Sequence, residues 1–147
     1  MKRFITITIL VLLPVLFLSG CLNPSVVTVV ERAYEAALME NDALLETFFS
    51  EEYLAEHPLD ELSIEMAEDV RNRQGTKLMN MKEHRGHLNP EIVKLLDDEY
   101  AGEWNFVAVQ TDDETIMTWI VQKGESKYSI VDGKKMNADV YLEEVLK

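Results

Sequence analysis

The feature that most constrains this chain is an apolar N-terminal run that ends at its only cysteine. Lys2 and Arg3 precede the run, residues 4–17 are apolar apart from two threonines, and Leu18-Ser19-Gly20-Cys21 closes it. A positive start, a short apolar stretch and small residues at its end are typical of a secretory signal peptide. A spanning helix would need about 20 apolar residues, and Pro14 interrupts this shorter run. Folding is therefore left to the residues after Cys21, which can form no disulfide.

The segment Leu18-Ser19-Gly20-Cys21 resembles the lipobox of bacterial lipoproteins. In that family the matching cysteine receives a diacylglyceryl group on its thiol, and cleavage leaves this cysteine as the new N-terminus. The resemblance implies that Cys21 is the lipid attachment site, with palmitate-type acyl chains, and that the Gly20-Cys21 bond is cleaved. Two acyl chains hold a protein firmly, because each buried methylene contributes about 0.8 kcal/mol. The alternative is an uncleaved anchor, or a signal peptide with a chance cysteine.

This interpretation divides the chain into three parts and places it at a cell membrane. Residues 1–20 are the signal peptide, residues 21–25 are the lipidated N-terminus with a short linker, and residues 26–147 are the folded domain. A chain of 147 residues without its leader fits one domain with one ordinary hydrophobic core. The predicted location is the extracytoplasmic face, with the domain held close to the bilayer.

The chain is strongly acidic, with 27 Asp and Glu residues against 14 Lys and Arg residues and a formal net charge of −13. Loss of the leader removes Lys2 and Arg3 but no acidic residue, so the mature chain would carry −15. Nucleic-acid binding needs a basic surface that neutralises phosphates, so we expect no nucleic-acid partner. The acidity favours a cationic partner, or serves solubility, and it repels the domain from an anionic bilayer.

The first part of the domain predicts two helices. Apolar residues recur at helical spacing over residues 26–38, with Ser25 as a suitable N-cap. Asn41-Asp42 breaks this pattern and could cap a second, short helix over the apolar residues of 44–49. The first helix would be amphipathic, and the second would be short and apolar.

Three further elements are expected before the sheet. His57-Pro58 interrupts the chain, and a third helix follows Ser63, with inward-facing apolar residues at Ile64, Ala67 and Val70. Residues 76–82 are predicted to be extended after Gly75. Asn89-Pro90 starts another short helix, because proline is favoured in the first helical turn, and this helix stops near residues 101–102.

The last part of the chain changes to the alternation of strands. Residues 104–109, 115–122 and 128–131 alternate between the two faces of a strand, and Asp112-Asp113 and Gly124-Glu125-Ser126 supply the turns. We expect an antiparallel meander whose last strand ends before Asp132-Gly133. A closing helix over 137–147 follows, with a strand as the alternative. The predicted fold class is α+β: a single domain with N-terminal helices packed on a curved, cone-like antiparallel sheet.

The helix-then-meander order resembles small lipoproteins with a nuclear-transport-factor-two-like, or cystatin-like, domain. The residues that carry this resemblance are Tyr34-Glu35-Ala36-Ala37-Leu38-Met39-Glu40-Asn41-Asp42 and Phe48-Phe49-Ser50-Glu51-Glu52-Tyr53. The resemblance implies a sheet that wraps the long helix and leaves a pocket at the open end of the cone. Members of such families bind small molecules, dimerise or have no catalytic role, so the fold by itself does not choose a function.

Two sets of residues have ligand-binding chemistry but are better explained as surface. His84 and His87, with His57, suggest a metal site, yet zinc needs three or four converging ligands, and we interpret the histidines as solvated loop residues. The acidic clusters 97–99 and 112–114 lack the spacing and central glycine of a calcium loop, so they are interpreted as solvated turns. We therefore predict no metal and no cofactor.

Other candidate pocket residues lie on the strands. Asn105, Thr118 and Asp132 are imaginable cavity residues, although a polar strand residue is more often on the solvent face. The large aromatic residues of the strands could line an apolar pocket, but we expect them to cover one face of the sheet against the first helix: Trp104, Phe106, Trp119 and Tyr128. The chain has no nucleophile elbow, phosphate loop or dinucleotide fingerprint. No catalytic residue is assigned.

These observations predict a membrane-anchored extracytoplasmic lipoprotein whose domain binds a protein or small-molecule partner without catalysis. The alternative is a small pocket enzyme of hydrolase or isomerase type, which would need a buried ionisable group that faces an open cavity. A third hypothesis is a structural role in the cell envelope as a homodimer formed through the outer face of the sheet.

Overall fold

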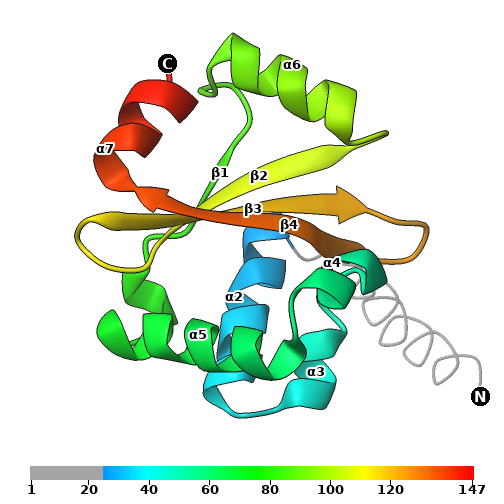
Figure 1. Cartoon of the computed structure of the whole chain (residues 1–147), viewed down its shortest axis with the longest axis vertical. Coiled ribbons are helices and arrows are strands. Elements are labelled where there is room, and N and C mark those ends of the chain that lie inside the picture. The colour runs from blue at the N-terminus through cyan, green and yellow to red at the C-terminus, as the bar shows by residue number, and fades with distance from the viewer. Residues whose placement is uncertain (1–24) are drawn as a thin grey trace, which may run out of the picture.

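The computed structural model describes residues 25–147, which form one compact α+β domain (Figure 1). Gly20 and Cys21, predicted as the cleavage and lipid attachment residues, lie outside the described residues. Within residues 25–147, no helix has the length and apolar character needed to cross a bilayer. The elements are α2 (Val26–Leu38), α3 (Asp42–Glu46), α4 (Glu51–Glu56), α5 (Leu59–Asn72), the 3-10 helix η2 (Thr76–Leu78), β1 (Lys82–His84), α6 (Pro90–Glu99), β2 (Trp104–Gln110), β3 (Thr115–Lys123), β4 (Tyr128–Asn137), α7 (Ala138–Val140) and the π-helix η3 (Tyr141–Val145).

Three helix starts that the sequence predicts, at Ser25, Asn41 and Asn89, are confirmed. The Ser25 side chain accepts a hydrogen bond from the Thr28 amide at the start of α2, and Asn41 accepts one from the Leu44 amide at the start of α3. Asn89 caps α6 in the same way. Each cap satisfies an amide that has no partner inside its helix, which is why these boundaries could be read locally.

The region around α4 and α5 differs from the sequence prediction. Ser50 caps the short helix α4, which the periodicity did not indicate. Helix α5 begins at Leu59, directly after Pro58, so Ser63 lies buried inside the helix instead of preceding it. The prediction that Ile64 faces inward is wrong, because its side chain is 62% exposed while Met66 and Val70 are buried.

The sheet is a four-stranded antiparallel meander in the order β1-β2-β3-β4. The three predicted strands are confirmed, and residues 82–84 add an edge strand, β1, beside β2. The extended segment predicted at 76–82 is partly wrong, since its first residues form the 3-10 helix η2.

Strand β4 also passes through Asp132-Gly133, where the sequence predicted its end. Gly133 pairs with Trp119 on β3, and a Cβ at Gly133 would lie 2.3 Å from the Trp119 ring. The glycine therefore makes room for an indole ring and does not form a turn.

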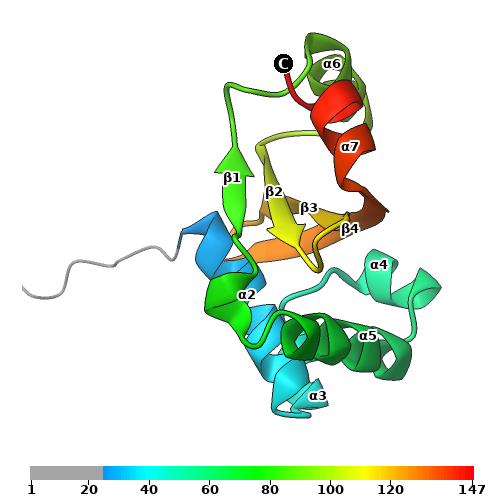
Figure 2. The ribbon, with the colours of Figure 1, turned by 90° about the vertical axis from the view of Figure 1, so that its left-hand side faces the viewer.

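Both faces of the sheet are buried. Helices α2 to α5 lie on one face, and α6 and α7 lie on the other (Figures 1 and 2). Trp119, Val107 and Val121 pack toward α2, whereas Trp104 and Phe106 pack toward α6 and η3. The expectation that the strand aromatics share one face is therefore wrong, because the C-terminal part of the chain covers the second face.

Coverage of the second face also bears on the homodimer hypothesis. The outer face of the sheet, through which that dimer was expected to form, is occupied by α6 and by the predicted closing helix, now α7 and η3. A homodimer stays a prediction, but its interface would have to use another surface.

Candidate functional site

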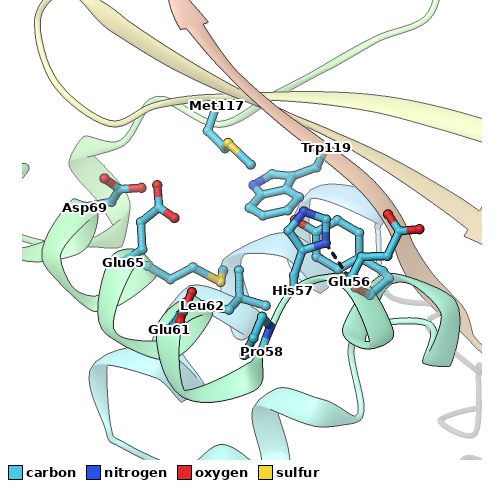
Figure 3. A pocket seen from close by; sticks show the side chains of 11 residues that line it. Glu56, His57, Pro58, Glu61, Leu62, Glu65, Asp69, Met117 and Trp119 are labelled. Atoms are coloured by element: carbon cyan, nitrogen blue, oxygen red, sulfur yellow. Dashed lines mark hydrogen bonds between the residues drawn. The ribbon is translucent and has the colours of Figure 1, made fainter.

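A cavity opens between the sheet and the corner where α4 meets α5 (Figure 3). Its volume is about 140 Å³. One wall comes from the helices and the other from the first half of β3. The lining residues are Tyr53, Glu56, His57, Pro58, Glu61, Leu62, Glu65, Met66, Asp69, Met117 and Trp119.

Local sequence explains how the helical wall is placed. Ser50 accepts a hydrogen bond from the Tyr53 amide and starts α4, and Pro58 forces a break before α5 because proline disfavours a helical residue ahead of it. Glu61, Glu65 and Asp69 then recur every four residues on α5. Residues at this spacing lie on one face of a helix, so α5 presents three carboxylates to the cavity.

At one end of the cavity, two of the lining carboxylates pair with the ammonium group of a lysine that is not itself a lining residue. Lys135 Nζ on β4 lies 2.8 Å from Glu65 Oε1 and 3.2 Å from Asp69 Oδ1. Burial raises the pKa of the Asp69 carboxyl, and the Lys135 ammonium partly opposes this shift by favouring the charged form. The same carboxylates contribute to raising the pKa of Lys135 against the opposing effect of burial. Lys135 therefore forms ion pairs with two carboxylates of the cavity wall, those of Glu65 and Asp69.

The opposite end is aromatic. The His57 and Tyr53 rings stack with centroids 4.1 Å apart and an angle of 12° between their planes. Trp119 meets Tyr53 edge-on at 6.2 Å, and His57 Nδ1 donates a hydrogen bond to the Tyr53 carbonyl oxygen at 3.0 Å. Burial is the main cause that raises the pKa of the Tyr53 phenol to about 12, so it stays protonated at neutral pH. Figure 3 shows Trp119 and His57 on the same side, away from Asp69.

The structure separates the three histidines. His57 lines the cavity, whereas His84 lies on the other side of the sheet and the His87 carbonyl oxygen accepts a hydrogen bond from the Lys147 amide near the C-terminus. The interpretation of His84 as a solvated loop residue is wrong: it lies on β1, is half-buried, and its Nε2 is 2.8 Å from the Tyr141 hydroxyl. Within residues 25–147, no group of three histidine, cysteine or acidic side chains could hold a metal ion.

The polar strand residues named from the sequence have structural partners and do not line the cavity. Asn105 is buried and accepts a hydrogen bond from Arg85, and buried Thr118 donates one to the Lys134 carbonyl oxygen. Asp132 accepts a hydrogen bond from the Tyr100 hydroxyl at 2.8 Å. The expectation that these side chains face solvent is therefore wrong for Asn105 and Thr118, which are buried.

The acidic clusters lie at a helix end and in a hairpin, as predicted. Asp97, near the end of α6, accepts a hydrogen bond from the Trp104 indole. Asp112 accepts one from the Glu114 amide and shapes the β2–β3 hairpin, while Asp113 pairs with Arg73 at 2.9 Å. These carboxylates are used within the fold and do not converge with the cavity.

The acidic side chains that line the cavity were missed by the sequence analysis. The four-residue spacing of Glu61, Glu65 and Asp69 was a readable signal for one acidic helix face. The sequence could not predict the opposing wall, because the tertiary fold brings Trp119 to Asp69 on α5 from 50 residues away.

The composition of the cavity indicates what it can do chemically. Four carboxylates beside an indole ring favour a cation, since aromatic faces attract cations and carboxylates pair with them. The lining contains no serine, threonine or cysteine that could act as a nucleophile. Asp69 is the one buried carboxylate among the lining residues, and a buried ionisable group is the feature a pocket enzyme would need.

Comparison with known proteins gives no assignment. No protein-family model, no curated protein and no solved structure matches this chain.

Proposed function

We propose that this protein is a lipid-tethered domain of the bacterial cell envelope that binds a small organic cation without catalysis. Cys21 would carry the diacylglyceryl anchor, and the cavity between α4, α5 and β3 would hold the cation. The observation that carries the proposal is the combination of four lining carboxylates with the Trp119, Tyr53 and His57 rings. This combination suits an ammonium or guanidinium group on a short apolar stem.

The size of the cavity limits the occupant. Sites for drug-sized ligands enclose roughly 300–1,000 Å³, and an engineered cavity of about 150 Å³ accepts benzene. At about 140 Å³, this cavity suits one cationic group with a few methylenes. The apolar side chains of Leu62, Met66 and Met117 would surround the stem.

The charge of the wall also supports a cation. Lys135 supplies one ammonium, which offsets one of the four lining carboxylates and pairs with Glu65 and Asp69. Glu56 and Glu61 have no ion-pair partner within residues 25–147 and stand at the solvent side of the cavity. A second cation can therefore be paired without displacing Lys135.

The test is a titration followed by the fluorescence of Trp119. The chain has two tryptophans, and a Trp104→Phe background leaves Trp119 as the reporter. The full chain in detergent micelles is titrated with butylammonium and with its neutral counterpart, butanol. We expect saturable binding of butylammonium alone. Glu61→Gln should weaken it about two- to five-fold, the range for an exposed ion pair, while Glu91→Gln on α6 should not.

Two results would contradict the proposal. Equal binding of butanol and butylammonium would show an apolar site, and equal effects of Glu61→Gln and Glu91→Gln would show only a response to net charge. Recovered ligand should be chemically unchanged by mass spectrometry.

The second candidate, a pocket enzyme, is favoured by the burial of Asp69. Its carboxyl lies in the cavity wall, and burial raises its pKa toward the range of a general base. Conversion of a bound amine or of an activated ester by the wild type, but not by Asp69→Asn, would support this enzyme. The contact with Lys135 argues against it, since the ammonium holds the carboxylate as an ion-pair partner.

A further inference from the structure

A second cavity lies at the other end of β3, and basic side chains line it where acidic side chains line the first. It has a volume of about 350 Å³ and is formed by α2, by the segment before α4 and by the β3–β4 turn, drawn in orange at the right of Figure 1. Arg32, Lys123 and Lys127 line it, together with one acidic residue, Glu125. The lining thus carries three cations against one carboxylate, in a chain whose net charge is −13.

The three cations remain available to an external anion. The ion pairs recorded within residues 25–147 involve Arg73, Arg85 and Lys135 and none of these three. Lys127 Nζ donates one hydrogen bond to the Thr47 carbonyl oxygen at 2.9 Å, which orients its ammonium and leaves two donors free. Val29 and Phe48 supply an apolar part of the wall. The cavity therefore combines positive charge with an apolar side.

Its position relative to Cys21 decides which anion is within reach. Ser25 is four residues after Cys21, so a fully extended chain separates them by at most about 14 Å. Val29, which lines the cavity, is one helical turn further, a rise of about 6 Å. A diacylglyceryl group on Cys21 would thus hold the cavity within about 20 Å of the membrane surface.

We infer that this basic cavity binds the phosphate of an anionic phospholipid headgroup and orients the tethered domain on the membrane. Guanidinium and ammonium groups pair with phosphate oxygens, and basic segments beside an anchor are attracted to anionic lipid. The lipid anchor alone would leave the orientation free, and the overall acidity would repel the domain. The cavity would supply an attractive contact in addition to the anchor. This inference rests on the anchor at Cys21 and is independent of cation binding at the first cavity.

The experiment uses the full lipidated chain in nanodiscs of phosphatidylcholine alone or with added phosphatidylglycerol. Amide hydrogen exchange of residues 123–128 is the readout. We expect several-fold slower exchange in the anionic discs, reversed by high salt. The protection should be lost in Arg32→Gln/Lys123→Gln, a variant that keeps the Lys127 contact. The matched control, Lys77→Gln/Lys94→Gln, removes the same charge from exposed positions elsewhere and should keep it.

Each other outcome would overturn the inference. Equal exchange in the two kinds of disc, or equal loss in both double variants, would mean that the cavity does not contact lipid. Protection of the turn by soluble glycerol phosphate on phosphatidylcholine discs would identify a site for a free phosphate ester. Dissociation of the protein from both kinds of disc would show that Cys21 carries no lipid anchor. Butylammonium binding does not depend on the anchor, so the two proposals can fail separately.

Discussion

Gly133→Ala should destabilise the domain by steric overlap with the side chains of Trp119 and Met117, without backbone strain. A Cβ at this position would lie 2.3 Å from Trp119 Cζ3, 2.4 Å from Cε3 and 2.7 Å from Met117 Cε. Carbon atoms pack at about 3.5–4.0 Å, so the indole would have to move by more than 1 Å. Trp119 is 1% exposed and packs against Tyr34, Phe49 and Tyr53, so a shift of the ring would disturb these three contacts.

Overpacking of this kind costs about 1–3 kcal/mol. For a domain of this size, the melting temperature should fall by roughly 3–15 °C, which thermal unfolding followed by circular dichroism measures. Because Trp119 also lines the first cavity, butylammonium affinity should fall in the folded variant.

The control is Gly86→Ala, which meets nothing within 4 Å and should leave the melting temperature unchanged. Trp119→Leu removes the ring that clashes, so the cost of Trp119→Leu/Gly133→Ala should be smaller than the sum of the single costs by about 1 kcal/mol or more. Equal stability of Gly133→Ala and Gly86→Ala, or additive costs in the double variant, would refute the reasoning.

Four other predictions test separate parts of the molecule. Ser50→Ala should cost about 1 kcal/mol in urea unfolding, because it removes the α4 cap. Ile64→Ala should lower the free energy of unfolding by less than about 0.5 kcal/mol and Met66→Ala by about 2–5 kcal/mol, because Ile64 is exposed and Met66 is buried. A larger cost for Ile64→Ala would show that Ile64 faces inward after all. The pKa of Tyr53 in the folded protein is about 12, above its ordinary value of 10.0. Its contribution to the free energy of unfolding is therefore present below pH 10 and lost toward pH 12. Tyr53→Phe should reduce this loss of stability between pH 10 and pH 12, measured by urea unfolding. Cys21→Ala should abolish incorporation of a labelled palmitate, and retained label would disprove the anchor.

Local signals in the sequence were sufficient for most element boundaries. Ser25, Asn41 and Asn89 each cap a helix with a side-chain oxygen, and such contacts span only two or three residues. Helix α5 begins at Leu59 without a side-chain cap, so the search for a capping residue placed its start at Ser63 instead. A boundary set by Pro58 and by tertiary packing leaves no capping signal to read.

The errors that involve the sheet have a different cause. Asp132-Gly133 reads as a turn because glycine is common there, yet the glycine is required by an indole on the neighbouring strand. The alternation of 104–109 did not show which face would be covered, because both faces carry apolar residues. The acidic wall was readable from helical spacing on α5, but its aromatic partner Trp119 arrives only through the tertiary fold.

Strand β3 relates the two proposed sites to each other. Met117 and Trp119 line the acidic cavity near its start, and Lys123 lines the basic cavity at its end. Six residues of strand separate Met117 from Lys123, about 20 Å at 3.3 Å per residue. With the basic cavity on the lipid and β3 directed away from the bilayer, the acidic cavity would lie more than a Debye length of about 8–10 Å from the headgroups. Its carboxylates are then screened from repulsion by the membrane, and anionic headgroups do not compete with it for a cation arriving from solution.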